Sequence, residues 1–165
     1  MPMDGELWVG YSNDDDFDRF VTARTNAQAL DWLADQFPDW NVRGFQLSKS
    51  DSDPRENALH LDCCFMPLGG GHAVVHVEGL KRPEDCDFLR TRFAGSLLEV
   101  DAQAMYDMQC NLFSVNPSTV VSDQMFVEVN RQLTRWGYDV WELDYQEIAK
   151  MEGLLRCTTL PLLRS

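Results

Sequence analysis

The stretch ALHLDCCFMPLGGGHAVVHV, residues 58–77, predicts a β-hairpin. Two largely apolar segments, 59–66 and 73–77, flank three consecutive glycines, which allow the backbone conformations that a tight turn needs. Pro83 then favours the start of a helix, and residues 96–100 predict a short strand after that helix. The local unit is therefore strand, turn, strand, helix, strand.

The same order of elements is expected twice more. Near the N-terminus, the pattern predicts an Asp4-Gly5 turn, a strand at 7–11, a helix capped by Asn26 and a strand at 42–47. Towards the C-terminus, it predicts strands at 111–115 and 119–121, a helix capped by Ser122 or Asp123, and a strand at 138–142. The apolar face of this last helix is formed by Phe126, Val129, Leu133 and Trp136. A repeat of about 50 residues predicts a stacked or ring-like architecture.

Two features predict that the repeated units are part of a larger ring. Only Met1-Pro2-Met3 precede the first turn, too few residues to be expected to pair with the strand at 7–11. The apolar segment 154–163 follows the third unit and is expected to pair with a strand of another unit. We therefore expect residues 1–165 to form one domain that is part of a larger α/β ring.

The composition favours a soluble protein with a small cationic ligand. The 165 residues are 44% hydrophobic, which is enough for one core. The net charge of −13 disfavours nucleic acids and anionic membranes as partners, because both would be repelled. Neither a membrane span nor a signal peptide is indicated. Five cysteines, including the pair Cys63-Cys64, favour the reducing cytoplasm. The acidic run 13–16 is expected to be an exposed loop tip.

A candidate site lies in the first half of the hairpin. If residues 59–66 form a strand, side-chain alternation places His60, Asp62 and Cys64 on one face. An imidazole and a carboxylate that lie side by side can share a cation, a proton or a metal ion. The other interpretation is a hairpin in which His60 has only a structural role.

Zinc binding is a further interpretation of the same hairpin. It would add His72 and His76, or Cys63 and Cys64, as ligands. The chain has no pair of CxxC motifs, however, and two adjacent cysteines on a strand face opposite sides. The sequence therefore assigns no metal ligands.

A second candidate is Cys157, in the segment MEGLLRCTTLPLL. An ordinary thiol is mostly protonated at neutral pH, so a nucleophilic cysteine needs positive charge nearby. A cationic substrate bound against carboxylates could supply that charge. The alternative is a cysteine that acts only as a small buried apolar residue.

Four motifs in order resemble the guanidine-modifying enzymes, namely Arg24-Thr25-Asn26, His60-Leu61-Asp62, Asn111-Leu112, and Gly153 shortly before Cys157. This superfamily includes arginine deiminases, dimethylarginine hydrolases and amidinotransferases. Its fold is the pentein, a five-bladed α/β propeller of ββαβ units. The resemblance runs from about Leu7 to Leu163, and it implies a partial pentein, about the last half of the ring, with the N-terminal blades absent.

The resemblance also implies a role for each matched residue. Cys157 would attack the guanidinium carbon and form a covalent amidino-thioether. His60 would give a proton to the leaving amine and then activate water or an acceptor amine. Asp62 would accept hydrogen bonds from the guanidinium group, Arg24 would bind the substrate α-carboxylate, and Asn111 would contribute hydrogen bonds at the end of a strand.

The chain departs from the family pattern in three places. The segment before the nucleophile contains Glu152 and Arg156, where the family often has more glycines and a histidine. An acidic loop, residues 12–17 and beyond, is inserted before Arg24. The family's other guanidinium-binding carboxylates would precede Met1. We therefore expect the isolated chain to be inactive or nearly so. Either the missing blades are encoded upstream of Met1, or a second copy or a partner chain supplies them.

The implied function is that of an amidinotransferase or an arginine deiminase-like hydrolase without a cofactor. The implied substrate is arginine or a related guanidino compound. Hydrolysis and transfer share the first covalent step, so both reactions stay open. The alternative functions are a non-catalytic acidic α/β binding module and, less favoured, a zinc-binding domain.

Overall fold

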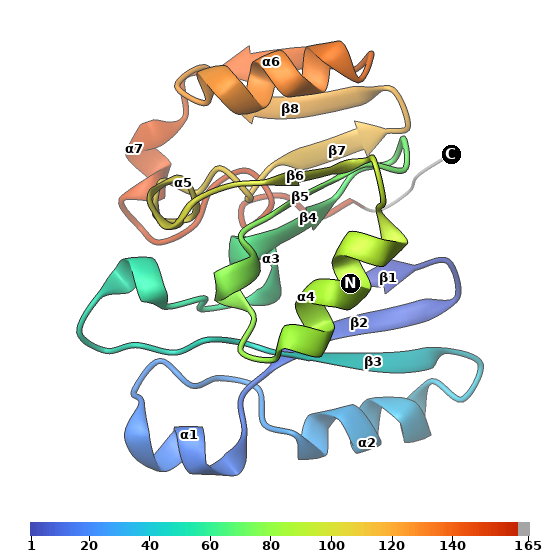
Figure 1. Ribbon diagram of the computed structural model, residues 1–165, viewed down its shortest axis with the longest axis vertical. Coiled ribbons are helices and arrows are strands. Elements are labelled where there is room, and N and C mark those ends of the chain that lie inside the picture. Colours follow the sequence, from blue (N-terminus) through green and yellow to red (C-terminus); the bar gives the residue numbers. More distant parts are fainter. Residues whose placement is uncertain (162–165) are drawn as a thin grey trace. The chain divides into compact units, whose positions relative to one another are not determined.

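The computed structural model describes residues 1–161, which contain three sheets of three strands each (Figure 1). The first sheet consists of β1 (Pro2–Met3), β2 (Glu6–Tyr11) and β3 (Asn41–Gln46). The second consists of β4 (Phe65–Pro67), β5 (Ala73–Val75) and β6 (Leu97–Glu99). The third consists of β7 (Phe113–Asn116), β8 (Thr119–Asp123) and β9 (Asp139–Leu143). In every sheet the first two strands are antiparallel and the third is parallel to the second.

A helix connects the two parallel strands of each sheet, because a parallel pair needs a crossover connection. These helices are α2 (Gln28–Gln36), α4 (Pro83–Arg92) and α6 (Val127–Arg135). Shorter helical segments are α1 (Asp14–Arg19), η1 (Pro54–Glu56), α3 (Leu61–Cys64), η2 (Val77–Gly79), α5 (Ala102–Tyr106) and α7 (Gln146–Ala149). The predicted strand, turn, strand, helix, strand repeat is thereby confirmed, and the fold is mixed α/β.

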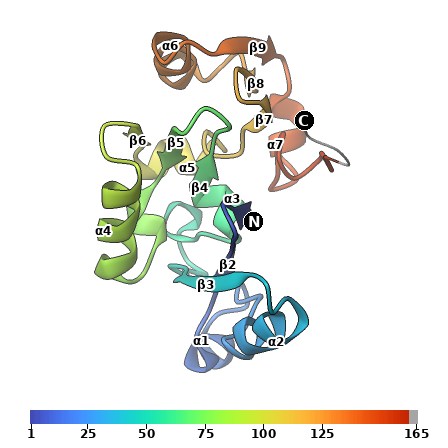
Figure 2. The same ribbon diagram turned by 90° about the vertical axis from the view of Figure 1, so that its right-hand side faces the viewer.

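The chain forms two compact units. The first comprises residues 1–61 and 78–88, and the second comprises residues 62–77 together with the chain from Leu89 onward. The first unit contains the first sheet, and α2 packs on its strand β3 (Figure 2). The second unit contains the other two sheets, and α6 packs on β9.

Aromatic residues form the core of the first unit. The ring of Trp8, which is buried, lies 5.1 Å from that of Phe45 and 5.6 Å from that of Phe88, measured between centroids. The guanidinium carbon of Arg43 lies 3.4 Å from the centroid of Phe88. This cation–π contact places an arginine directly over the core.

The core of the second unit joins its two sheets. Its buried members are Met66, Leu68, Val74, Cys110, Leu112, Val120, Phe126, Val129, Leu133, Tyr138, Leu154 and Leu155. The predicted α6 face is confirmed for Phe126, Val129 and Leu133, which are buried, while Trp136 is partly buried against them.

The glycine turn of residues 69–71 also contacts the third sheet. The backbone N–H of Gly69 donates to Ser114 Oγ at 3.0 Å, and that of Gly70 donates to Tyr138 Oη at 3.1 Å. A Cβ at position 70 would lie only 2.5 Å from Tyr138 Oη. Glycine is therefore needed at position 70 for this close contact, whereas the left-handed conformation in the turn is that of Gly71, with a φ of 85°.

Several local expectations were wrong. Pro2 and Met3 do pair with β2, opposite Leu7 and Glu6. Helix α6 begins at Val127, because residues 122 and 123 continue β8, where Asp123 Oδ1 instead accepts a hydrogen bond from the N–H of Met125.

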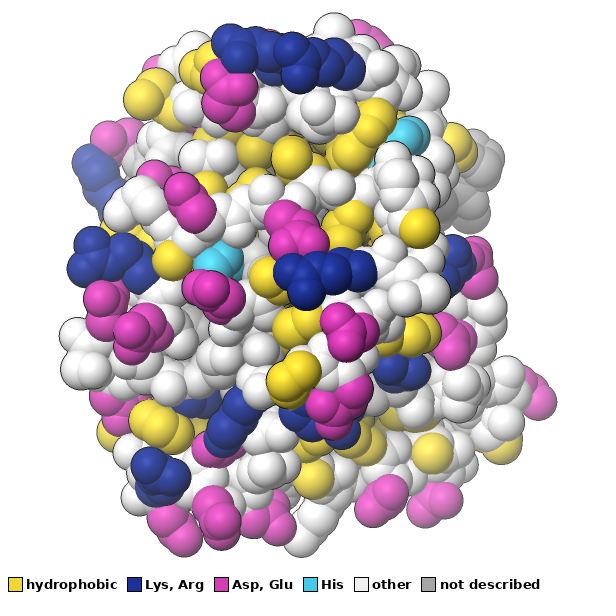
Figure 3. Space-filling model, in the orientation of Figure 1, with side chains coloured by type: hydrophobic (Ala, Val, Ile, Leu, Met, Phe, Trp, Pro, Cys, Tyr) yellow, Lys and Arg dark blue, Asp and Glu magenta, His cyan; other side chains and the backbone are white. Residues whose placement is uncertain are grey.

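The acidic run 13–16 is also not a loop tip. It caps and begins helix α1, and Asp16 is buried, where its carboxylate accepts a hydrogen bond from Lys81 Nζ at 2.9 Å. Acidic side chains are nevertheless widely spread over the face drawn in Figure 3.

The apolar segment after the third sheet was expected to pair as a strand. Residues 154–161 contain no strand, and Leu154 and Leu155 pack into the core of the second unit itself. Residues 162 and 163 of that segment lie outside the described part of the chain. Within residues 1–161, none of the helices has the length and apolar character required to cross a bilayer.

We predict that the Asp85 carboxylate is a major contributor to the stability of the first unit. It is fully buried and receives hydrogen bonds from Arg82 Nε at 2.9 Å and Nη2 at 2.7 Å. Asp85→Asn should lower the free energy of unfolding by about 3 kcal/mol in urea titrations, because the Arg82 guanidinium loses this short ion pair and keeps a longer contact with the exposed Glu84 carboxylate at 3.8 Å. Glu99→Gln, which breaks the more exposed pair with Arg90, should cost about 1 kcal/mol or less. Equal losses for the two variants would contradict the prediction.

Candidate active site

Cys157 lies in a turn that follows α7, and two leucines anchor this turn. Leu154 and Leu155 are buried in the core of the second unit. Glu152 has a φ of 61°, in the left-handed region, which directs the chain from α7 into the turn. Cys157 itself is exposed, whereas Cys63, Cys64 and Cys110 are buried. The fold thus presents one of its thiols on a rigidly anchored turn.

Gly153 is required for the closeness of this turn. A Cβ at position 153 would lie 2.9 Å from Cys157 Cβ and 3.3 Å from Cys157 Sγ. Any larger residue would therefore displace Cys157. The glycine that the sequence pattern placed shortly before the cysteine thus has a steric reason to be there.

The side-chain amide of Asn111 organises the turn. Asn111 is fully buried, and its Oδ1 accepts hydrogen bonds from the N–H groups of Leu154 at 3.1 Å, Arg156 at 3.1 Å and Cys157 at 3.3 Å. Its Nδ2 donates to the carbonyl oxygen of Asp62 at 3.0 Å and to Cys157 Sγ at 3.3 Å. One amide therefore connects the cysteine turn with helix α3.

Asp62 lies on the other side of the sulfur. Cys157 Sγ is 3.9 Å from Asp62 Oδ2, to which the thiol donates a long hydrogen bond. Burial and the negative charge of Asp62 raise the pKa of the Cys157 thiol, and these two effects outweigh the N–H groups of Leu154 and Asn111 and the charge of Arg156. The thiol is therefore protonated at neutral pH when nothing else is bound. We call Cys157, Asn111 and Asp62 the sulfur site.

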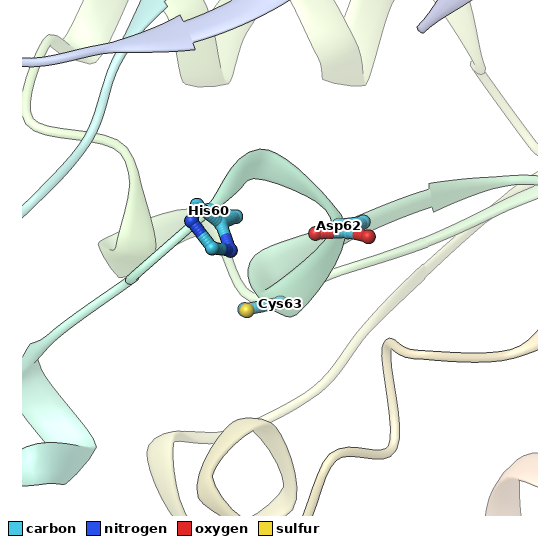
Figure 4. A group of neighbouring side chains, drawn as sticks. All are labelled: His60, Asp62 and Cys63. Carbon is cyan, nitrogen blue, oxygen red and sulfur yellow. The ribbon is translucent and has the colours of Figure 1, made fainter. Parts of the chain in front are cut away.

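The local structure around His60 differs from the prediction. Residues 61–64 form the short helix α3 instead of a strand, so alternation does not apply to His60, Asp62 and Cys64. His60 directly precedes the helix, and Asp62 and Cys63 extend from its first turn (Figure 4). Asp62 is still placed beside Cys157, but by a helical turn. His60 belongs to the first unit, and its role at the sulfur site stays a prediction.

Three possible metal ligands occur in this short stretch. The ligand atoms of His60, Asp62 and Cys63 lie within 4.8 Å of one another (Figure 4). The group includes neither His72, whose Nδ1 is 3.0 Å from Tyr138 Oη, nor His76, whose Nδ1 is 2.9 Å from the carbonyl oxygen of Val100. Zinc binding by the hairpin histidines gains no support from these contacts, and metal binding by His60, Asp62 and Cys63 stays a hypothesis.

Arg24 lies in the first unit, on the loop between α1 and α2. Its Nη1 donates to the carbonyl oxygens of Val21 at 2.7 Å and Ala23 at 3.0 Å. Asp51 holds the same loop by accepting hydrogen bonds from Val21 N and Thr22 Oγ1. The guanidinium group is thus bound to its own loop, and its predicted contact with a substrate carboxylate stays a prediction.

Comparison with protein families places these residues in a known context. The family model for eukaryotic N,N-dimethylarginine dimethylhydrolase matches residues 20–164, nearly the whole chain. The chain belongs to this family. A curated relative, the uncharacterized protein YkgA of Bacillus subtilis (strain 168), is 30% identical over 144 residues, which are 87% of this chain and 47% of YkgA.

Solved structures show the same fold. The N-terminal domain of ArgZ, an arginine dihydrolase from cyanobacteria, matches 97% of this chain and 52% of its own, with 22% identity and a TM-score of 0.76. AgrE in complex with ornithine and NAD⁺ matches 98% of this chain and 21% of its own, with 24% identity and a TM-score of 0.74. SxtG, an amidinotransferase from Microseira wollei, matches 85% of this chain over 42% of its own length, with 19% identity and a TM-score of 0.64.

These likenesses confirm the predicted superfamily and fold class. This chain has the pentein fold of the guanidine-modifying enzymes. It spans about half the length of YkgA and of the ArgZ domain, at 47% and 52%.

The contacts that hold the site together could not be predicted from the sequence. The motif gave Asn111 a hydrogen-bonding role but did not identify the three N–H groups from which its Oδ1 accepts hydrogen bonds. One signal was available, since Asn111 stands between Cys110 and Leu112 in an apolar context, and a buried amide must find partners. Which partners it finds depends on contacts between residues more than 40 positions apart.

We predict that Gly153→Ala slows alkylation of Cys157 by iodoacetamide about tenfold near neutral pH. The added Cβ displaces Cys157 from the Asn111 donor, which stabilises the thiolate. A rise of about one unit in the pKa of the thiol lowers the thiolate fraction, and with it the alkylation rate, about tenfold. The rate is measured by mass spectrometry of the Cys157 peptide. As a control for general backbone strain in the same unit, Gly71→Ala strains a left-handed position, with a φ of 85°, without crowding Cys157, and it should leave the rate unchanged. An unaltered rate in folded Gly153→Ala would count against this account of the turn.

Proposed function

We propose that this chain carries the nucleophile and part of the substrate-binding site of a guanidine-modifying enzyme. The observation that carries the proposal is the sulfur site, where an exposed thiol lies 3.9 Å from a carboxylate oxygen and 3.3 Å from an amide donor. Membership of the dimethylarginine dimethylhydrolase family supports the same chemistry. The substrate, the covalent step and the partners below are all parts of the proposal.

A guanidinium group would change the charge balance at the sulfur. Burial and the Asp62 carboxylate raise the pKa of Cys157. A guanidinium bound to Asp62 would pair with that carboxylate through charge-assisted hydrogen bonds and add a positive charge next to the sulfur. Both changes favour the thiolate. The substrate would therefore activate the nucleophile that attacks it.

The proposed reaction begins with attack by the thiolate on the guanidinium carbon. A carbon–sulfur bond forms, and one carbon–nitrogen bond breaks as His60 gives a proton to the leaving amine. Water or an acceptor amine, activated by His60, then displaces the sulfur and releases Cys157 as a thiolate. A solved structure of the ArgZ N-terminal domain is described as covalently bound to a reaction intermediate, which supports a covalent route for a relative of this fold.

The proposed substrate is arginine or a related guanidino compound. Arg24 would bind the substrate α-carboxylate, provided that its guanidinium leaves the loop carbonyls that it now contacts. Hydrolysis and amidino transfer both fit, because the relatives include an arginine dihydrolase and an amidinotransferase. We also propose a cytoplasmic location, which suits five cysteines with a vicinal pair. Because the chain spans about half of its relatives, we propose that an upstream segment, a second copy or a partner chain supplies the remaining blades.

We predict that Cys157 prefers 2-chloroacetamidine, a cationic alkylating reagent, over the neutral iodoacetamide. The preference is the ratio of the two alkylation rates at Cys157, divided by the same ratio for an ordinary thiol in solution. Asp62 would bind the amidinium, and the thiolate would displace chloride to give a thioether. Asp62→Asn should reduce this preference about tenfold or more, because a charge-assisted contact worth about 1.5–3 kcal/mol is lost. Peptide mapping by mass spectrometry gives the rate at each cysteine.

Two controls accompany this experiment. Glu142→Gln removes an exposed carboxylate on β9 and should leave the preference for the amidinium reagent unchanged. Equal labelling of all five cysteines, or an unchanged preference in Asp62→Asn, would contradict the proposal. That result would instead favour the second candidate function, an acidic α/β binding module in which Cys157 has a structural role.

A further inference from the structure

We infer that Asn111 is a catalytic residue whose Nδ2–H group is the permanent hydrogen-bond donor to the Cys157 thiolate, in addition to holding the cysteine turn through Oδ1. This inference rests on the proposed function in so far as Cys157 is the nucleophile. It extends the role expected for Asn111, a hydrogen-bonding residue at the end of a strand, to a direct contact with the reacting sulfur.

The orientation of the amide is fixed by its surroundings. Three N–H donors, from Leu154, Arg156 and Cys157, point at one amide atom, so that atom must be the oxygen. The nitrogen then faces the carbonyl oxygen of Asp62, which can only accept. A flipped amide would place donor against donor and acceptor against acceptor. The donor therefore faces Cys157 Sγ as a consequence of the hydrogen-bond network.

Both N–H bonds of this amide have a partner. One donates to the carbonyl oxygen of Asp62 at 3.0 Å, and the other donates to Cys157 Sγ at 3.3 Å. Asn111 is fully buried, so water does not compete for its donors. A hydrogen bond is stronger when its acceptor is ionised and when water is excluded. The contact with sulfur is therefore worth more for the thiolate than for the thiol.

The sulfur thus lies between two groups with opposite preferences. The Asp62 carboxylate, 3.9 Å away, accepts from the thiol and opposes its ionisation. The Asn111 donor favours the ionised form. A cation that pairs with Asp62 removes the first influence and leaves the second in place. Asn111 would then stabilise the thiolate that attacks, and it would do so again when the thioether carbon–sulfur bond breaks and the sulfur leaves as a thiolate.

Asn111→Asp separates the two roles of the amide. Aspartate keeps an oxygen for the three N–H groups of the turn and replaces the Nδ2 donor by a second oxygen that faces the sulfur. We expect the variant to fold, its Cys157 alkylation by iodoacetamide to slow about ten- to hundredfold near neutral pH, and the midpoint of its pH–rate profile to move to higher pH. Loss of the donor and the new carboxylate oxygen beside the sulfur both raise the pKa of the thiol, so an unchanged midpoint in the folded variant would overturn the inference.

The matched control is Asn130→Asp in the same unit. Asn130 is also a buried asparagine, which accepts from Ser122 Oγ and donates to the carbonyl oxygen of Asp123 at 2.8 Å. Its replacement perturbs α6 and should leave the midpoint of Cys157 alkylation where it is in the unchanged chain. A similar shift in both variants would show a general effect of a buried charge, which would also overturn the inference.

A measurement on the unchanged chain covers the case in which Asn111→Asp does not fold. The two Nδ2 proton resonances of Asn111 are followed by NMR as the pH is raised. One of them should move with the same midpoint as the Cys157 alkylation profile, because its acceptor becomes charged at that pH. A resonance that does not respond to ionisation of Cys157 would refute the contact.

The choice of reagent separates this inference from the proposed function. Iodoacetamide carries no amidine or guanidino group, so its reaction reports on the sulfur alone. A shifted midpoint in Asn111→Asp together with no preference for 2-chloroacetamidine would support the Asn111 donor and reject the guanidino substrate. The reverse combination would support the substrate and reject the donor.

Discussion

The buried amide of Asn111 is the interaction on which the site depends. Its oxygen gathers three N–H groups of the cysteine turn, and its nitrogen connects the turn to helix α3. Without it, the N–H groups of Leu154 and Cys157 would need other partners, whereas that of Arg156 also donates to the backbone carbonyl of Asn111. An unsatisfied buried donor costs about 1–3 kcal/mol. Gly153 completes the arrangement, because a side chain at that position would occupy the space of Cys157. The exposed sulfur is thus held by groups that are themselves buried.

Much of the fold could be predicted because short local motifs identify the elements of the repeat. The Gly69–Gly71 turn, Pro83 at the first position of α4 and the apolar face of α6 each identify one element. Prediction failed where the decisive contacts are distant in sequence. Asp16 was expected on the surface but is buried, and Lys81, which is distant in sequence, donates a hydrogen bond to its carboxylate. Composition alone does not reveal such a partner.

The site was predictable in its members and not in its geometry. Leu61, Cys63 and Phe65 alternate as in a strand, but four residues also fit a single helical turn, and so short a segment does not distinguish the two periods. The helix still brings Asp62 to Cys157, so the predicted neighbour is present for a different structural reason. The match to the dimethylarginine dimethylhydrolase family confirms the resemblance that the ordered motifs indicated, while the roles of His60 and Arg24 remain proposals.

The central claim is that Cys157 and His60 act on the same guanidinium carbon. The sulfur must approach that carbon to about 3–3.5 Å, and the imidazole must lie within about 3 Å of the leaving nitrogen. The most direct test is a crystal structure of the chain with a guanidino compound bound, in which the distance from Cys157 Sγ to the nearer ring nitrogen of His60 is measured. The account predicts a distance within about 7 Å, with the guanidinium between them. An imidazole that faces away from the sulfur, at more than about twice that distance, would contradict it.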